Sequence, residues 1–151
     1  MTLDLRAGLY EACRQISPIH PNYATLPIQT GFDWSALSGR SFDGLYLVVF
    51  RSVRRMTADL DLLREYDDHA YKEALGSGGL LRYFKGDADE RGQCLSFCLW
   101  KNREDARRAS GGKMHGEAAR LTAEMYESYL LERYELTASE DIEAEPVFRR
   151  L

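Results

Sequence analysis

The sequence predicts an α+β domain in which four strands and two helices follow the order β-α-β-β-α-β. A strand rich in β-branched and aromatic residues at 45–53 precedes a helical segment, and a second apolar strand at 93–100 again leads into helical segments. Each helical stretch is followed by another strand candidate. Two strand-helix-strand halves that form one antiparallel sheet make a ferredoxin-like domain.

The first 43 residues are predicted to form a helix and an extended, wrapping arm. Apolar side chains at positions 5, 9, 12, 13 and 16 mark one face of a helix over 4–16, with Thr2 or Asp4 as its N-cap. Residues 17–31 contain three prolines and no hydrophobic period. We expect this arm to be ordered because its apolar side chains need a surface to pack on. They are Ile19, Tyr23, Leu26, Ile28, Phe32 and Trp34.

The predicted ferredoxin-like domain occupies residues 44–136. Its first strand runs over 45–53, and Thr57 can cap a helix that reaches Leu75. The glycine-rich run 76–79 then ends this helix, because glycine supplies the left-handed residue of a helix C-cap. Strands are predicted at 80–85 and 93–100, and the acidic loop 86–92 joins them.

The second half of the domain repeats this pattern. Asn102 can cap a short helix over 103–109, which Gly111 and Gly112 interrupt. A further helix is predicted over 114–127 and a fourth strand over 129–136. The tail 137–151 either docks as an extra strand or stays loose.

Composition excludes several classes of protein. A chain of 151 residues with 44% apolar and 29% charged residues is one ordinary globular domain. The net charge of −4 argues against nucleic acid and anionic membranes as partners, because both attract basic surfaces. No apolar run approaches the ~20 residues of a membrane-spanning helix. Three cysteines without zinc spacing and the lack of a signal peptide indicate a reducing, cytoplasmic location.

Part of the chain resembles a known enzyme family. Leu99-Trp100 ends a strand, Glu104-Asp105-Ala106 lies in the next helix, and His115 opens the following segment. This pattern, within 44–136, is similar to the antibiotic-biosynthesis-monooxygenase family. The resemblance implies a dimeric α/β barrel and oxygenase chemistry without a cofactor.

A second resemblance covers more of the chain. The segments 21–27, 31–34, 46–52, 125–127 and 131–134, together with Tyr129, look like an uncharacterised family of small fungal and bacterial proteins. That family carries no activity over to this chain, so the resemblance supports the fold and leaves the function open.

Two residues are candidates for acid–base catalysis. His115 stands at a predicted helix start, where the helix dipole keeps an imidazole neutral and able to act as a base. A surface or capping histidine is the alternative. Asp67 lies near the apolar stripe of its helix, where a carboxylate must be paired or have a raised pKa. A salt bridge to Arg51 or Arg82 is the alternative. His69 is expected to be exposed, and His20 to be structural.

Other residues are candidates for a ligand pocket. Cys94, Ser96, Cys98 and Trp100 alternate onto one strand face, and small residues there leave room for a flat ligand. Plain packing is the alternative. An inward-facing Arg51 would meet an anionic ligand or Asp67. The predicted pocket wall consists of Trp100, Tyr71, Tyr126 and Cys98.

These features lead to a ranked prediction of function. The first choice is a small cofactor-independent monooxygenase that acts on a flat, hydrophobic molecule, with His115 and Asp67 as acid and base and Arg51 as anion anchor. The alternative is a module that binds a small ligand or haem without catalysis, and a purely structural oligomer ranks third. No metal site is predicted. A homodimer is expected because a four-stranded sheet leaves one face bare.

Overall fold

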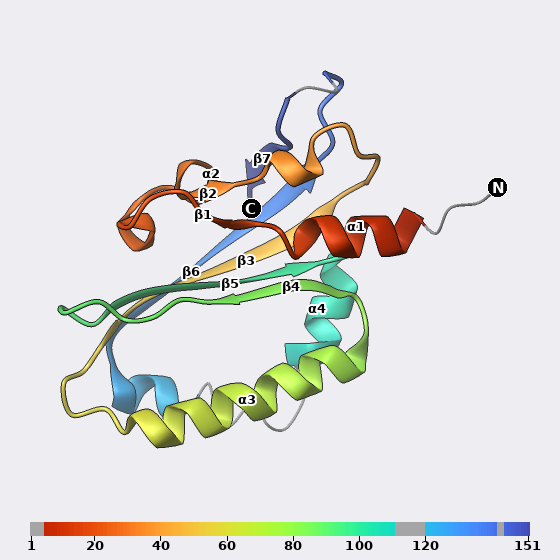
Figure 1. Cartoon of the computed structure of the whole chain (residues 1–151). Helices are drawn as coiled ribbons and strands as arrows, with labels where there is room; N and C mark the ends of the chain where they lie inside the picture. Colours follow the sequence, from red (N-terminus) through yellow and green to blue (C-terminus); the bar gives the residue numbers. More distant parts are fainter. Residues whose placement is uncertain (1–4, 111–119, 142–143) are drawn as a thin grey trace.

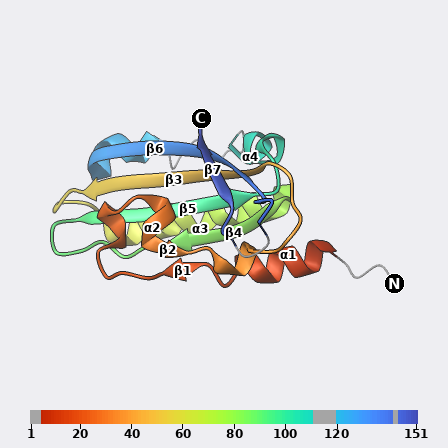
Figure 2. The ribbon, with the colours of Figure 1, turned by 90° about the horizontal axis from the view of Figure 1, so that it is seen from above.

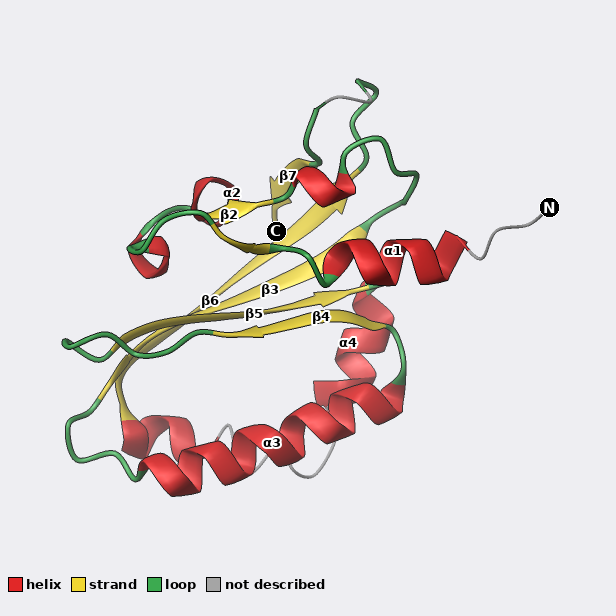
Figure 3. Ribbon diagram, in the orientation of Figure 1, coloured by secondary structure: helices red, strands yellow, loops and turns green. Residues whose placement is uncertain are grey.

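The computed structural model describes residues 5–110, 120–141 and 144–151. Figure 1 shows three layers: an N-terminal arm on one face of a twisted sheet, the sheet itself, and helices on the opposite face. Figure 3 distinguishes these helices and strands by colour. The sheet has the order β4-β5-β3-β6-β7, and every neighbouring pair is antiparallel. The first four strands have the ferredoxin-like β-α-β-β-α-β connection, which confirms the predicted fold class.

The strands lie close to their predicted positions. They are β3 (Leu45–Arg54), β4 (Leu80–Lys85), β5 (Gln93–Trp100), β6 (Tyr126–Thr137) and β7 (Val147–Arg150). The β6 strand begins three residues earlier than predicted. The helix predicted over 114–127 is helical over 120–125 in its described part, so its predicted end was two residues too late. The tail docks as β7, in register with the end of β6.

Two helices cover one face of the sheet. The long helix α3 (Leu60–Ser77) and the short helix α4 (Arg103–Ser110) lie beneath it in Figure 1. The N-cap of α3 is Asp59 and not the predicted Thr57, because the Asp59 carboxylate accepts a hydrogen bond from the Leu62 N–H at 3.0 Å. For α4 the predicted cap is confirmed, since Asn102 Oδ1 accepts from the Asp105 N–H at 2.8 Å.

The arm lies along the other face of the sheet (Figure 2). It contains α1 (Leu5–Cys13), β1 (Ser17–Pro18), η1 (Tyr23–Thr25), α2 (Ile28–Gly31), β2 (Phe32–Asp33) and η2 (Ser35–Leu37). The two short strands pair with each other rather than with the main sheet. The prediction of an ordered arm is therefore confirmed, although Ile19 is 56% exposed and does not pack as expected.

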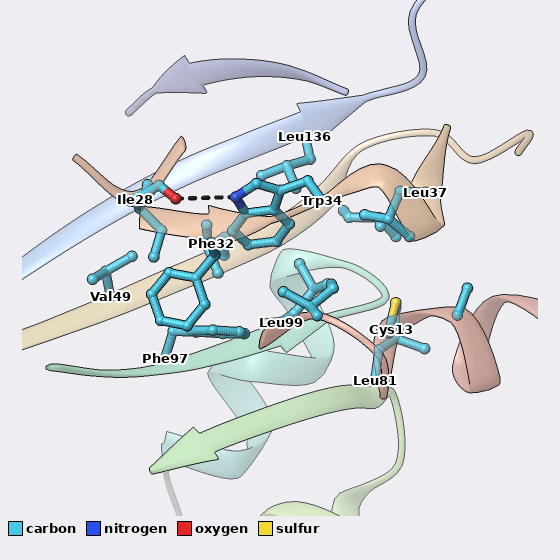
Figure 4. Close-up of a cluster of buried hydrophobic side chains, with 14 of the residues drawn as sticks. Cys13, Ile28, Phe32, Trp34, Leu37, Val49, Leu81, Phe97, Leu99 and Leu136 are labelled. Carbon is cyan, nitrogen blue, oxygen red and sulfur yellow. Dashed lines mark hydrogen bonds between the residues drawn. The ribbon is translucent and has the colours of Figure 1, made fainter. Parts of the chain in front are cut away.

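The main core lies between the arm and the sheet (Figure 4). Phe32 and Trp34 are fully buried against Phe97, and Phe32 meets Phe97 edge-to-face with ring centroids 5.3 Å apart. The Trp34 indole N–H donates to the Ile28 carbonyl at 3.0 Å, which satisfies the one polar atom of that buried side chain. The sheet face that was expected to need a second subunit is thus covered by the chain's own arm. The reason for which the sequence predicted a homodimer therefore does not apply to this chain.

Candidate functional site

A cavity of about 320 Å³ lies between the other face of the sheet and α3. This volume is at the lower end of the range typical for small-molecule pockets. The strands contribute Phe50, Ser52, Arg54, Leu80, Tyr83, Lys85, Cys94, Ser96, Cys98, Tyr126, Tyr129 and Leu131 to its wall. The helical side contributes Leu63, Tyr66, Asp67, Ala70, Tyr71, Ala74, Leu121 and Thr122, and Gly86 completes the described lining.

Strand alternation explains which residues reach the cavity. Ser52 of β3 is paired with Cys94 of β5 and Tyr129 of β6, so all three side chains share one sheet face. The intervening residues on β5, such as Phe97, point into the arm-side core. Small side chains on β5 leave the space, whereas aromatic side chains on β3, β4 and β6 form the walls.

A β-bulge places Tyr126 in this wall. The pairing of β3 with β6 is regular up to Val53 opposite Ser128, and then shifts so that Arg54 lies opposite Tyr126. The extra residue, Glu127, reverses the alternation at the start of β6. Tyr126 and Tyr129 therefore both line the cavity although they are three residues apart.

The cavity wall is rich in tyrosine. Tyr71 of α3 stacks on Tyr83 of β4 with ring centroids 5.0 Å apart and planes 27° apart. Tyr126 and Tyr129 lie 5.4 Å apart on the other side. Burial raises the pKa of Tyr83, Tyr126 and Tyr129 above the usual 10.0, so these hydroxyls stay neutral at physiological pH. They offer flat apolar surfaces with hydrogen-bonding ends.

The two thiols in the cavity are unreactive. Burial raises the pKa of Cys98 to about 12 and also raises that of Cys94, so neither forms a thiolate at neutral pH. Cys94 donates its S–H to the Gly86 carbonyl at 3.1 Å. Both side chains therefore act as small apolar lining groups.

Asp67 supplies a carboxylate to the cavity. Helical spacing places it on the same face of α3 as Leu63, Ala70 and Tyr71, as the sequence suggested. Its carboxylate lies 3.2 Å from the Lys85 ammonium group, so the partner is a lysine rather than the predicted Arg51 or Arg82. Both side chains are about one-third exposed, and this ion pair therefore contributes little to stability.

The structure brings four predicted site residues to the cavity: Asp67, Tyr71, Cys98 and Tyr126. Trp100 faces the same side but does not line the cavity, because α4 covers that end of β5. Its ring is buried among Tyr46, Ala74, Leu80, Ala106 and Ala109. His115 lies outside the described residues. His69 is exposed, as expected, and His20 is also exposed.

Arg51 lies on the opposite sheet face, so it does not meet Asp67 or the cavity. Its guanidinium group donates to the Ala24 and Leu26 carbonyls of the arm at 2.9 and 2.8 Å. Its Nε also donates to the Glu132 carboxylate at 2.5 Å. The proposed role of Arg51 as anion anchor in this cavity is therefore wrong, because odd-numbered residues of β3 face the arm.

Arg54 is one of the cavity residues that sequence reasoning missed, together with Lys85, Tyr83 and Tyr129. It is the last residue of β3 and lies on the same strand face as Phe50 and Ser52. The alternation along the strand could therefore have indicated that Arg54 faces the cavity. The predicted strand ended at Val53, one residue too early. Two cations and one carboxylate thus lie in the described wall: Arg54, Lys85 and Asp67.

The described residues carry neither a metal-binding cluster nor a membrane-spanning helix. Within 5–110, 120–141 and 144–151, no group of three or more His, Cys, Asp or Glu side chains could hold a metal ion. None of the described helices has the length and apolar character needed to cross a bilayer.

The sheet order and the cavity beneath its helices define a ferredoxin-like α+β protein with a small-molecule-sized pocket. The chain belongs to the PB2B2.08-like family, whose model matches residues 2–148. A curated relative, the UPF0643 protein PB2B2.08 of Schizosaccharomyces pombe, is 37% identical over 101 residues. That match covers 63% of this chain and 46% of the relative, so the chain spans about half of the relative's length.

Solved structures share the fold at low sequence identity. A candidate antibiotic biosynthesis monooxygenase from Nitrosomonas europaea has a TM-score of 0.53 at 11% identity, over 65% of this chain and 93% of that one. A protein from Shewanella oneidensis has a TM-score of 0.55 at 12% identity, and the match covers 64% of this chain and 95% of that protein. These likenesses establish the ferredoxin-like fold and do not extend to activity.

Proposed function

We propose that the cavity binds a flat aromatic molecule and that the protein oxidises it as a cofactor-independent monooxygenase. The observation that carries the proposal is the tyrosine-walled cavity with a carboxylate, Asp67, at its edge. Stacked and tilted rings on two sides suit a planar ligand, and the small side chains of β5 leave space for it.

A monooxygenase without a cofactor must take all its electrons from the substrate. The substrate therefore needs an acidic C–H group whose carbanion is stabilised by the aromatic system. Asp67 would accept this proton, and the carbanion would add dioxygen to give a hydroperoxide. Loss of water then converts the CH₂ group and O₂ into a C=O group and H₂O, which balances atoms and electrons.

The proposal retains His115 as a second acid–base group. It is tested by His115→Ala with the exposed His69→Ala as control. We expect activity or ligand retention to be lost in the first variant and unchanged in the second. An essential His69 and a dispensable His115 would move the catalytic site away from the predicted one.

The reaction is tested with anthrone, a tricyclic ketone with an acidic CH₂ group. Purified protein should consume dioxygen, and labelled ¹⁸O₂ should place one atom in the quinone product and one in water. Asp67→Asn should lower kcat/KM about 100-fold. The exposed neighbour Asp68→Asn should leave kcat/KM unchanged. Tight binding of anthrone without dioxygen uptake would instead favour the non-enzymatic ligand-binding module.

The remaining predictions belong to the same proposal. No cofactor is required by this reaction, and a haem ligated by histidine would use His115, since neither His20 nor His69 lines the cavity. A cytoplasmic location agrees with the three unpaired thiols of Cys13, Cys94 and Cys98. Metal analysis and absorption spectra of protein from its own host test whether a metal or haem cofactor is bound.

A further inference from the structure

The arginine at the end of β3 lines the cavity and carries a shielded, unsatisfied hydrogen-bond donor. The Nε of Arg54 is shielded from solvent, and it has no hydrogen-bond partner in the described structure. A buried donor without an acceptor costs free energy, more so when it carries charge. An acceptor supplied by a ligand would remove this cost.

The position of Arg54 is fixed by the backbone. The backbone N–H of Arg54 donates to the Gly92 carbonyl at 2.7 Å, and the backbone N–H of Arg55 donates to the Met125 carbonyl at 2.8 Å. The bulge places Arg54 directly opposite Tyr126. Burial and the negative charge of Asp67 raise the pKa of Tyr126, and the positive charge of Arg54 and its side-chain hydrogen bond to Tyr126 act against this rise. The guanidinium and the phenol therefore act on the same region of the cavity.

The charges in the described wall do not cancel. Asp67 is its only described carboxylate, and it already pairs with Lys85 at 3.2 Å. Burial keeps Tyr83, Tyr126, Tyr129 and the two thiols neutral at physiological pH, because it raises their pKa values. One positive charge, that of Arg54, is therefore left over, although the whole chain has a net charge of −4.

Two other arginines of the sheet, Arg51 and Arg82, differ from Arg54. Arg51 is paired with Glu132 and two carbonyls. Arg82 also has an unsatisfied Nε, but its terminal nitrogens donate to the Ile16 and Tyr83 carbonyls, and it does not line the cavity. Among these three, only Arg54 combines an unsatisfied donor with access to the pocket.

We propose that the natural ligand of this cavity is a planar aromatic molecule with one anionic oxygen group, which the Arg54 guanidinium binds. The guanidinium donates to the anionic oxygen, the Tyr126 hydroxyl lies beside it, and the ring system lies between the tyrosines. This assignment rests on the proposed function and narrows its substrate class. It is independent of which C–H group reacts.

The test compares two probes that share a naphthalene ring and differ in their polar group, an anionic carboxylate in one and a neutral hydroxymethyl group in the other. Isothermal titration measures the Kd of 2-naphthoate and of the neutral 2-naphthylmethanol at neutral pH. The wild-type protein should bind the carboxylate roughly tenfold more tightly. Arg54→Gln should lose this preference and keep its affinity for the alcohol. Arg55→Gln, which removes an adjacent exposed arginine, should retain the wild-type preference.

Each outcome decides between the two proposals. Equal wild-type affinities, or an unchanged preference in Arg54→Gln, would overturn the anionic ligand and leave the aromatic cavity in place. Binding of neither probe would overturn the proposed function, and the present inference with it. Circular dichroism checks the fold of the variants. If Arg54→Gln does not fold, Arg54→Lys should fold and show a reduced preference, because lysine keeps the charge without the planar fork.

Discussion

At the residue scale, Arg51 joins three parts of the chain that are distant in sequence. It binds Glu132 of β6 and two carbonyl groups of the arm, and both charged side chains are less than one-fifth exposed. Removing the guanidinium group leaves a shielded carboxylate and two carbonyls without their donor.

We expect Arg51→Ala to lower the free energy of unfolding by about 2 kcal/mol. Arg55→Ala, which removes an exposed arginine on the same segment, should change it by less than about 0.5 kcal/mol. Urea denaturation of both variants measures the difference. Equal, small losses would mean that the Arg51 contacts contribute no net stability.

Glu132 makes the stability of this contact depend on pH. Burial acts to raise its pKa, but hydrogen bonds from Arg51 and Tyr134 outweigh burial and hold the pKa below the ordinary 4.5. A carboxyl group with a lowered folded-state pKa stabilises the fold above its unfolded pKa, and this stability is lost as the pH falls through the folded value.

Glu132→Gln should therefore be less stable than the wild type at neutral pH, and this gap should narrow as the pH falls below 4.5. Urea titrations at several pH values measure the gap. Glu135→Gln, which removes a more exposed ion pair with Arg149, is the control and should have a small effect at every pH. A gap that stays constant with pH would contradict the role of Glu132.

At the element scale, helix α3 carries one wall of the cavity and depends on a single cap. The Asp59 carboxylate accepts the Leu62 N–H, which would otherwise lack an intrahelical partner. Asp59→Ala should cost about 1 kcal/mol. Asp68→Ala, an exposed position in the middle of the same helix, should be nearly neutral. Thermal unfolding of both variants gives the comparison.

The main strands could be predicted from the sequence because their alternation is long and regular. The same alternation placed Cys94, Ser96 and Cys98 on the correct common face of β5. The bulge at Tyr126 could not be predicted, since one extra residue in a strand leaves no periodic signal. The sheet face on which Arg51 lies could not be predicted. It depends on whether the even- or the odd-numbered residues of β3 face the helices, and both sets are largely apolar.

At the scale of the whole molecule, the arm and the sheet form one core. Beyond α1, the arm contains only two-residue strands and single helical turns, so tertiary contacts rather than local periods determine its shape. Its aromatic residues were a sufficient signal that it packs, but they did not indicate on which face.

Trp34 tests how strongly the fold depends on this packing. Its ring is fully buried and meets Phe148 of β7 as well as Phe97 of β5. Trp34→Ala should lower the free energy of unfolding by about 3–5 kcal/mol. Ile19→Ala, at an exposed position of the arm, should change it by less than about 0.5 kcal/mol. Urea denaturation measures both changes. A loss at Trp34 as small as the loss at Ile19 would show that the arm is not part of the core.

The covered sheet face also determines how the chain should associate. With the arm in place, the full chain should have its monomer mass of 17.3 kDa in light scattering, rather than the dimer mass predicted from the sequence. Deleting residues 1–34 uncovers the apolar side chains of Leu47, Val49 and Phe97, so the shortened chain should self-associate or aggregate and unfold at a lower temperature. A full-length dimer would require a different interface. Burial of this much aromatic surface should stabilise the fold, so its removal should lower the Tm. A truncated chain with an unchanged Tm would therefore mean that the arm contributes no stability.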